Sequence, residues 1–260
     1  MVLATYHKYG IRLTHIWFAS EQEIKETIES KTPKTDVLFV HGADMSDFSS
    51  AYSVSRQKTL IKHIGGTEED IWGTFGKHLR KFINRSINEN TTVKIFYGKD
   101  INDSILKQCA VLYEDMKRDK GIPDHFNMEL AKLYARQENL LVSLAYSEGE
   151  AIGFKASIID CRCLRGWVSA FCFREHEEAA QLIGRAHQQL EWETMKYCLQ
   201  RGIRFYDFGG IDSFENPNGI AKFKMALAKE GDHVCYDNFL IGKSWIGKLA
   251  VSVKKKISKK

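Results

Sequence analysis

The sequence of 260 residues predicts an α/β fold, in which a mixed, mostly antiparallel central sheet is flanked by helices. Short apolar runs alternate with stretches of helical periodicity from residue 92 onward, which indicates strands and helices in alternation. Residues 140–160 alternate apolar and polar positions on both sides of a Ser-Glu-Gly-Glu turn, as a β-hairpin does. Only three prolines occur, and no Pro-, Gly- or Ser-rich linker divides the chain.

The first part of the chain, residues 1–90, is expected to form a small N-terminal α/β extension. Residues 35–42 (TDVLFVHG) have the apolar character of a buried strand. Thr67 is followed by three acidic residues, which favour a helix start because the N-terminal end of a helix attracts negative charge. This predicted helix, 67–90, has an apolar face, and its opposite face carries several lysines and arginines.

The rest of the chain has the predicted element order β-α-α-β-β-β-α-β-α-β. Strands are expected at 92–98, in the hairpin 140–160, and at 164–173, 203–210 and 233–241; helices are expected at about 101–119 and 127–138, up to about 201, and at about 218–228. We therefore predict one module over residues 91–242 and a basic C-terminal tail over 243–260.

Composition narrows the classes of partner. The net charge of +5 fits anionic partners such as nucleotides, phosphates and acidic lipid headgroups, but it is too weak for a dedicated nucleic-acid binder, so no nucleic acid is expected. The six cysteines are scattered without a CxxC pair, and Cys172 lies in an alternating apolar strand, so buried thiols in a reducing compartment are favoured. No secretory signal or membrane-spanning run is visible, and we expect a cytoplasmic protein.

A short glycine-containing motif opens the long helix that follows the strand at 164–173. Gln181, Gly184 and Ala186 have the spacing Q-x-x-G-x-A. A turn before a helix offers amides without intrahelical partners together with the positive end of the helix dipole, so a pyrophosphate is a natural occupant. The alternative is a helix start whose amides face water, with Gly184 present for packing.

The element order and this motif resemble the GNAT (Gcn5-related N-acetyltransferase) superfamily, and residues 150–154 (EAIGF) on the second hairpin strand are also typical of it. The resemblance implies a GNAT fold. It also implies acyl-coenzyme A as co-substrate, with no metal. The pyrophosphate of the donor would be held by Gln181, Leu182, Ile183, Gly184, Arg185 and Ala186.

The segment after the long helix is similar to the Fem-type branch of this superfamily. The similarity rests on Tyr206-Asp207-Phe208-Gly209-Gly210, then Asn216-Pro217 and Lys222-Phe223-Lys224, and on the basic helix with Arg80, Asn84 and Arg85. It covers roughly residues 65–240. Fem-type aminoacyltransferases carry two such modules and several carry a long helical arm, whereas this sequence has room for one module and a short N-terminal piece.

These resemblances imply an N-acyltransferase that moves an acyl group from acyl-CoA to the primary amine of a nucleotide-linked amino sugar. The acceptor would be a dTDP- or UDP-amino deoxysugar used for surface polysaccharide, as in O-antigen and lipopolysaccharide biosynthesis. The alternative within the same fold is a Fem-type tRNA-dependent aminoacyltransferase that acts on a peptidoglycan-like precursor. A third hypothesis is a catalytically idle module used for binding.

The expected reaction is direct attack of the amine on the thioester, which requires a base and a proton donor. Asp207 at the end of a buried strand, or Glu175 or His176 before the motif, could accept the proton, as could a water chain. The structural alternative for Asp207 is that it binds the amides of the following turn. Tyr206 or Tyr236 could protonate the leaving thiolate, or either could be a core tyrosine.

Several cations could bind the acceptor. Arg80 and Asn84 are four residues apart, so they project from one helix face and could hold a nucleotide diphosphate. Tyr206 is a further candidate for binding the acceptor. Lys224 could hold a phosphate or stabilise the oxyanion of the tetrahedral intermediate. Solvated charge is the alternative for each cation. The tail could lie on an anionic membrane surface as a basic amphipathic segment, or could be a frayed end.

Overall fold

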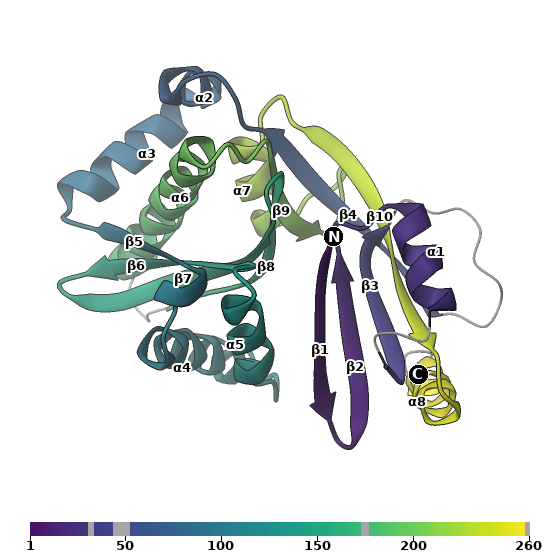
Figure 1. The fold of residues 1–260 in the computed structure, drawn as a ribbon. Helices are drawn as coiled ribbons and strands as arrows, with labels where there is room; N and C mark the ends of the chain where they lie inside the picture. Colours follow the sequence, from purple (N-terminus) through teal and green to yellow (C-terminus); the bar gives the residue numbers. More distant parts are fainter. Residues whose placement is uncertain (31–33, 44–52, 173–176, 258–260) are drawn as a thin grey trace. The chain divides into compact units, whose positions relative to one another are not determined.

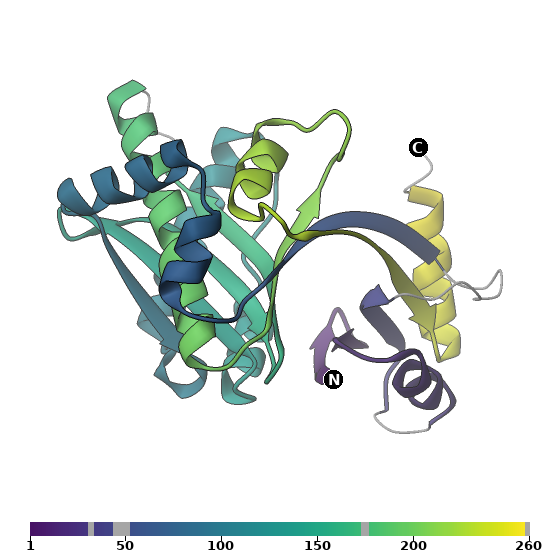
Figure 2. The same ribbon diagram turned by 90° about the horizontal axis from the view of Figure 1, so that it is seen from above.

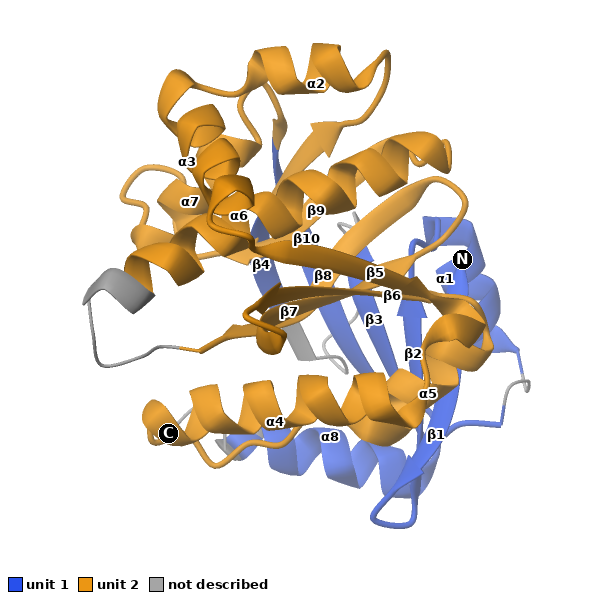
Figure 3. Ribbon diagram, turned by 90° about the vertical axis from the view of Figure 1, so that its left-hand side faces the viewer, with its two compact units in different colours: residues 1–59, 233–260 blue, residues 60–232 orange. Residues whose placement is uncertain are grey.

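A computed structural model describes residues 1–30, 34–43, 53–172 and 177–257 (Figure 1). The chain forms two compact units (Figure 3): unit 1 comprises residues 1–59 and 233–260, and unit 2 comprises residues 60–232. The chain passes between the units within β4 (Ser53–His63) and at the start of β10 (Asp232–Gly242). Among the described helices, none combines the length and the apolar composition that a bilayer crossing requires.

The sheet of unit 2 has the strand order β4-β9-β8-β7-β6-β5. Besides β4, its strands are β5 (Thr92–Tyr97), β6 (Leu140–Ser147), β7 (Glu150–Ile159), β8 (Cys163–Phe171) and β9 (Phe205–Ile211). Strands β5 to β8 pair antiparallel, and β8 pairs with β9 in parallel. Ser147 pairs with Glu150 across Glu148 and Gly149, whose φ values of 54° and 83° match the two-residue turn that suits the twist of a hairpin.

Helices cover both faces of this sheet (Figure 1; Figure 2). On one face lie α2 (Glu68–Thr74), α3 (Lys77–Asn88) and α6 (Glu177–Gln200), and α3 packs along α6. On the other face lie α4 (Asp103–Asp119) and α5 (Met128–Arg136), with the 3₁₀ turn η1 (Gly98–Asp100) before them, while α7 (Gly219–Leu227) follows β9. Thr67 and Asp70 form a reciprocal capping box at α2, as the acidic stretch predicts.

The core of unit 2 lies where α3 and α6 meet the sheet. Its buried members include Phe75 and Ile83 from α2–α3, Trp192 and Met195 from α6, and Tyr206 from β9. The rings of Phe75 and Trp192 meet edge to face at 5.5 Å, a geometry that aromatic pairs favour. Burial of each such side chain is worth about 1.5–3 kcal/mol. This packing fixes α6 over the sheet and so fixes the residues that α6 presents to β8 and β9.

Unit 1 contains the strand order β1-β2-β3-β10-β4, with β1 (Val2–Lys8), β2 (Ile11–Trp17), β3 (Val37–Ala43), α1 (Glu21–Glu29) and α8 (Trp245–Ile257). Alternate residues of a strand face opposite sides. Ile16 and Leu38 therefore pack with α1 in an apolar cluster. On the other side Trp17, His41, Phe39 and His15 stack ring on ring along β2 and β3.

The expected α/β class with a mixed, mostly antiparallel sheet is confirmed, but the chain divides differently from the expected boundaries at 90 and 242. Residues 67–90 belong to unit 2, because α3 packs on α6. Strand β10 and helix α8 belong with the N-terminal strands, because β10 pairs antiparallel with β3, with Phe239 opposite Val40. The predicted N-terminal extension is thus completed by the C-terminal segment.

Candidate active site

The two parallel strands at the centre of unit 2 part after three residues of pairing. β8 and β9 are in register only from Cys163–Arg165 with Phe205–Asp207, yet β8 continues to Phe171 and β9 to Ile211. The last close approach requires glycine: Gly209 has φ 73°, and a Cβ there would lie 2.8 Å from the carbonyl oxygen of Gly166. Among the described residues, β8 and β9 form no further ladder pairs beyond this point, so the two strands separate here.

A buried ionic cluster lies next to the split. The Lys155 ammonium on β7 donates to both carboxylate oxygens of Glu191 on α6, at 3.0 and 2.8 Å. The Tyr206 hydroxyl donates to Glu191 at 2.6 Å and accepts from Lys155 at 3.0 Å. Burial raises the pKa of Tyr206 well above its usual range, and nearby Glu191 raises it further. Burial alone would raise the pKa of Glu191, but Lys155 and His187 bring it below its ordinary value.

His187 and Lys224 lie at the margin of this cluster. The imidazole of His187 stacks between Phe171, the last residue of β8, and Phe223 of α7, with ring centroids 4.0 and 4.2 Å away. Its Nε2 is 3.6 Å from Glu191. Burial lowers the pKa of His187, and Lys155 and Lys224 act in the same direction against the opposing effect of Glu191. The ring is therefore neutral at pH 7.

Lys224 stands on the β9 side of the split. Its ammonium donates to the carbonyl oxygen of Gly210 at 2.7 Å. Burial, followed by the charge of Lys155, lowers the pKa of Lys224 to about 8. A cation that is held beside open strand ends, and that is partly stripped of water, can stabilise a developing oxyanion. The predicted Lys224 therefore lies beside a neutral histidine that the sequence analysis did not single out.

Asp207 does not face a substrate space, contrary to one expectation. Its side chain is 1% exposed, accepts the amide N–H of Gly209 at 2.8 Å, and lies 3.5 Å from the guanidinium of Arg165. This is the structural role foreseen as the alternative, in which an aspartate at a strand end binds the following turn. The expected role of Tyr206 changes for a similar reason, because its hydroxyl is committed to Glu191 and Lys155 inside the core.

The Q-x-x-G-x-A motif is helical throughout, which corrects the expectation of a turn. Helix α6 begins at Glu177, so the amides of Gln181 to Ala186 fall after the first four of the helix and have intrahelical acceptors. Ile183 and Ala186 pack in the core, and Leu182 packs against the same cluster. Gln181 and Gly184 are exposed on one face of the helix, and a Cβ at Gly184 would meet nothing within 4 Å.

Arg185 is a structural residue rather than a free cation. Its guanidinium donates twice to Glu89 after α3, at 2.8 and 2.9 Å, and Arg85 donates to the same carboxylate at 2.8 Å. Burial would raise the pKa of Glu89, but these two arginines hold it below its ordinary value. Arg80 is half-buried and Asn84 exposed on α3, and in the described part of the chain no hydrogen bond joins either of them to Lys224.

Glu175 and His176 lie outside the described residues. Tyr236 lies in β10.

Sequence reasoning missed Lys155, His187 and Glu191. Their signal is present: a lysine interrupts the apolar strand 152–159, and a histidine and a glutamate four residues apart lie on the core-facing side of α6. Charged residues inside apolar patterns are rarely buried without a partner, so such positions mark either an ion pair or a site.

The fold places the chain in an acyl-transferring class of protein. A model of the acetyltransferase (GNAT) domain matches residues 77–225, more than half of the chain, and the chain belongs to this family. A search among curated proteins found no significant match.

Three solved structures are similar over most of the chain. The C-terminal domain of a putative lysylphosphatidylglycerol synthetase from Agrobacterium fabrum is 9% identical, with 98% of this chain and 84% of that chain covered and a TM-score of 0.57. FemX is 12% identical, with 91% and 83% covered and a TM-score of 0.58. L-PGS from Bacillus licheniformis is 12% identical, with 99% and 86% covered and a TM-score of 0.54. At these identities the likeness concerns the fold.

Proposed function

We propose that the protein is an acyl-CoA-dependent N-acyltransferase whose acceptor is the primary amine of a nucleotide-linked amino sugar. The observation that carries the proposal is the split between β8 and β9, with α6 beginning shortly after β8 and with His187 and Lys224 on its two sides. Membership of the acetyltransferase (GNAT) family supports a thioester donor. The amino sugar, of the dTDP or UDP type used in O-antigen and lipopolysaccharide assembly, is our inference from the Fem-like motifs.

The donor would bind with its diphosphate at the N-terminal end of α6. The helix has 24 residues, and its first amides precede Gln181. Unpaired amides and the positive helix end favour a phosphate there. Gln181 and Gly184 would then border the ligand from the exposed helix face, where the open space at Gly184 leaves room for a close approach.

The chemistry would take place in the split. The amine nitrogen forms a bond to the thioester carbonyl carbon, the carbon–sulfur bond breaks, and coenzyme A leaves as a thiolate that takes up a proton. Neutral His187 would accept the proton of the attacking amine, and the Lys224 ammonium would stabilise the oxyanion. Lys155 and Glu191 would hold the histidine in place, since Nε2 of His187 faces the Glu191 carboxylate.

The acceptor would be bound from the α3 side. Arg80 and Asn84, one turn apart, would hold the nucleotide diphosphate. Arg85 is committed to Glu89 and is not included.

The alternative donor is a charged tRNA, as in Fem-type transfer to a peptidoglycan-like precursor. One observation favours keeping it: the likeness to FemX covers 91% of this chain and 83% of that chain, so it extends beyond unit 2 into unit 1. A thiol-release assay with acetyl-CoA and a panel of dTDP- and UDP-amino sugars separates the two. Release that depends on an amino sugar supports our proposal, and transfer only from charged tRNA replaces it with the alternative.

Calorimetry tests the donor directly. Coenzyme A should bind the wild type, and Gly184→Trp should weaken binding at least about tenfold by crowding the helix face. Because no atom lies within 4 Å of a Cβ at Gly184, this variant should keep its fold. Exposed Lys81→Trp on α3 is the matched control. Unchanged binding by Gly184→Trp contradicts the placement of the donor.

We also propose a weak contact between α8 and anionic membrane surfaces. Trp245 and Leu249, one turn apart, are 76% and 59% exposed, and Val253 continues the stripe. Lys248, Lys254 and several further lysines accompany it, and the helix holds no acidic residue. An apolar stripe with basic flanks is the pattern of an interfacial helix. Co-sedimentation with phosphatidylglycerol vesicles, reduced in Trp245→Glu and absent with phosphatidylcholine, tests the contact.

A further inference from the structure

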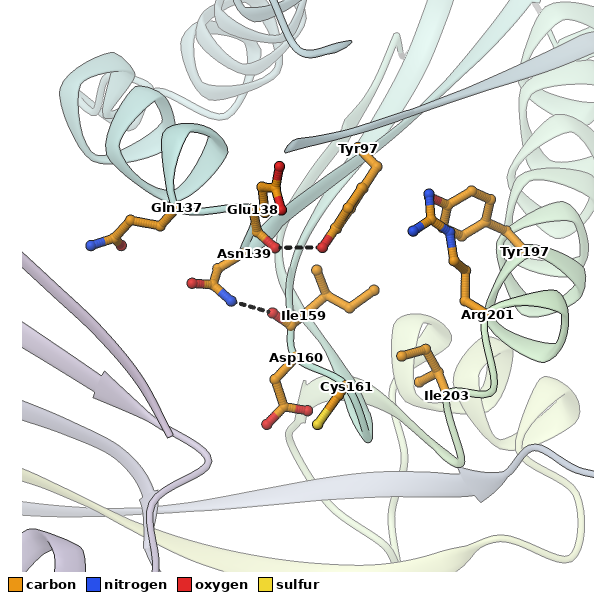
Figure 4. A pocket seen from close by; sticks show the side chains of 10 residues that line it. All are labelled: Tyr97, Gln137, Glu138, Asn139, Ile159, Asp160, Cys161, Tyr197, Arg201 and Ile203. Carbon is orange, nitrogen blue, oxygen red and sulfur yellow. Dashed lines mark hydrogen bonds between the residues drawn. The ribbon is translucent and has the colours of Figure 1, made fainter. Parts of the chain in front are cut away.

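The end of unit 2 at which α6 finishes carries a cavity remote from the strand split. It has a volume of about 420 Å³, within the range of small-molecule sites. It opens between the turn after α5, the end of β7 and the last turn of α6 (Figure 4). Gly184 and Gln200 are separated by about 24 Å along the helix axis. A ligand in this cavity is therefore distinct from a donor whose diphosphate lies at the start of α6.

An arginine flanked by tyrosines forms one wall of the cavity. The guanidinium of Arg201 lies 4.7 Å from the ring centroid of Tyr97 and 5.2 Å from that of Tyr197 (Figure 4). The Tyr97 hydroxyl donates to the carbonyl oxygen of Glu138 at 2.8 Å, which fixes one of the two rings. Burial raises the pKa of Tyr97 and of Tyr197, so both rings stay neutral beside the cation. Arg201 is thus oriented before any ligand arrives.

Two more arginines border an adjoining cavity of about 430 Å³. Arg162 and Arg204 line it, and Cys161 lines both cavities. The amide N–H groups of Arg204 and Phe205 donate to the carbonyl oxygen of Arg162 at 2.9 and 3.1 Å, so the β7–β8 turn and the α6–β9 turn are tied together. Three guanidinium groups are therefore presented by two turns that the backbone holds in place.

Two carboxylates, those of Glu138 and Asp160, also line the first cavity. Glu138 pairs with Lys99 at 3.4 Å, and Asp160 accepts the amide N–H groups of Arg162 and Cys163 at 2.8 Å each. Across the described ranges, no carboxylate forms an ion pair with Arg162, Arg201 or Arg204. Within the described ranges Asp160 has no cation partner and offsets one positive charge, so the three guanidinium groups leave a net positive charge around the joined cavities. This charge favours a multivalent anion, and the planar guanidinium matches phosphate oxygens in pairs.

We propose that these joined cavities bind a diphosphate-bearing small molecule, with Arg201 holding one phosphoryl group and Arg162 and Arg204 the other. The inference does not rest on the proposed acyl transfer, because the two sites share no residue. The diphosphate can be inorganic or part of a nucleoside diphosphate, since the arginines recognise the phosphoryl oxygens that both have in common.

The test is calorimetric titration of the full chain with inorganic pyrophosphate, and then with UDP, ADP and phosphatidylglycerol vesicles. Wild type should bind pyrophosphate, and the affinity should fall as salt rises. Arg201→Gln and Arg204→Gln should each raise the dissociation constant about tenfold or more, because each removes a charge-assisted contact to a phosphoryl group. Arg118→Gln, an exposed arginine on α4, removes the same charge elsewhere and should leave binding unchanged.

The outcomes separate this site from the donor site. Loss of pyrophosphate binding in Arg201→Gln but not in Gly184→Trp supports the proposal. Binding of UDP or ADP that is tighter than that of pyrophosphate, and that is also lost in Arg201→Gln, identifies a nucleotide as the ligand of these cavities. The opposite pattern, loss in Gly184→Trp alone, overturns it. Absence of pyrophosphate and nucleotide binding also overturns it, as does binding of vesicles only. Circular dichroism melting of each variant verifies the fold.

Discussion

The two units differ in how deeply their charged side chains are buried. Every described charged residue that is at most 5% exposed belongs to unit 2, and these residues are Lys62, Lys155, Arg165, Glu191 and Asp207. In the described part of unit 1 the corresponding interior is apolar on the α1 side, and a stack of aromatic rings lies on the other side. Its most buried described carboxylates, Asp36 and Asp237, are 9% exposed and lie next to a half-buried and an exposed arginine, respectively.

This difference indicates where the chemistry lies. Removing a charge from water is costly, and an ion pair in the interior is often no more stable than apolar residues of the same size. Buried ionisable groups that gather beside an open strand end are therefore candidates for function rather than for stability. Unit 2 has such a gathering at the β8–β9 split, and the described part of unit 1 has none of comparable burial.

The largest expected effect comes from breaking the buried pair. Glu191→Leu should lower the free energy of unfolding by about 3–5 kcal/mol, because it leaves the Lys155 ammonium buried without its carboxylate. Glu21→Gln in unit 1 removes an exposed one-turn pair with Lys25 and should cost only about 0.3–0.5 kcal/mol. Urea denaturation measures both. Equal losses of unfolding free energy in the two variants would contradict the proposed difference between the buried pair of unit 2 and the exposed pair of unit 1.

The Lys155→Met/Glu191→Leu double variant sharpens this result. Replacing both partners by apolar residues should recover most of the stability, since no unpaired charge remains. It should not recover activity, since His187 loses the carboxylate near its Nε2.

Lys224 should control the rate and its dependence on pH. Lys224→Met should lower kcat about 10²–10³-fold by removing the charge beside the developing oxyanion. In the wild type, kcat with the amine saturating should fall as the pH rises through about 8, where the ammonium loses its proton. Lys224→Arg should keep part of the activity and move this fall to higher pH, because a guanidinium stays charged. A profile that rises through pH 8 would assign Lys224 the role of a base.

His15 should make unit 1 sensitive to acid. Burial, aided by Lys254, lowers the pKa of His15 to about 4 from 6.5. Between these values the unfolded chain binds the proton and the folded chain does not, so stability should fall as the pH drops from 6.5 to 4, by at most about 3.4 kcal/mol. His15→Gln should flatten the curve in this window. Amide hydrogen exchange in β2 and β3, measured as a function of pH, reports the local stability. The same pH dependence in His15→Gln and in the wild type would show that His15 is not the responsible group.

The smallest expected effect is that of alanine at Gly184, and a second helical glycine, Gly247, should respond with the opposite sign. Gly184→Ala should raise stability by about 0.5–1 kcal/mol, because its Cβ meets open space in α6. Gly247→Ala in α8 should lower stability instead, because its Cβ would collide with the Asp36 carbonyl group. Thermal melting shows whether each variant is more or less stable than the wild type. A rise in the KM for acyl-CoA in Gly184→Ala, despite greater stability, would mark the helix face as a ligand surface.

Local patterns in the sequence were sufficient to predict many of the strands and helices of unit 2. The hairpin follows from alternation around Ser147–Glu150, and α2 follows from the Thr67 cap, because both depend on residues close in sequence. The start of α6 was misjudged because a glycine suggests a turn, yet Gly184 costs a long, well-packed helix only about 1 kcal/mol. The pairing of β10 with β3 joins residues about 200 apart, and no local signal reveals it.

The candidate site was predicted less completely than the fold. Short sequence motifs were enough to select Lys224 and Gly184 as candidates. The Lys155–Glu191 pair and His187 come together only through the packing of β7, α6 and α7. Asp207 shows the converse: its position in a motif suggested chemistry, but its depth and its bond to Gly209 make it structural. The packing of elements that are distant in sequence decides which charged residues find an ion-pair or hydrogen-bond partner. Local sequence patterns do not reveal this packing.

The central claim is that the start of α6 and the neighbouring strand split receive a coenzyme A thioester. A crystal structure of the protein with coenzyme A tests it most directly. We expect the diphosphate within hydrogen-bonding distance of the amides that precede Gln181, and the thiol in the split between His187 and Lys224. Coenzyme A bound elsewhere, for instance with its diphosphate on Arg201, or a thiol far from both side chains, would contradict it.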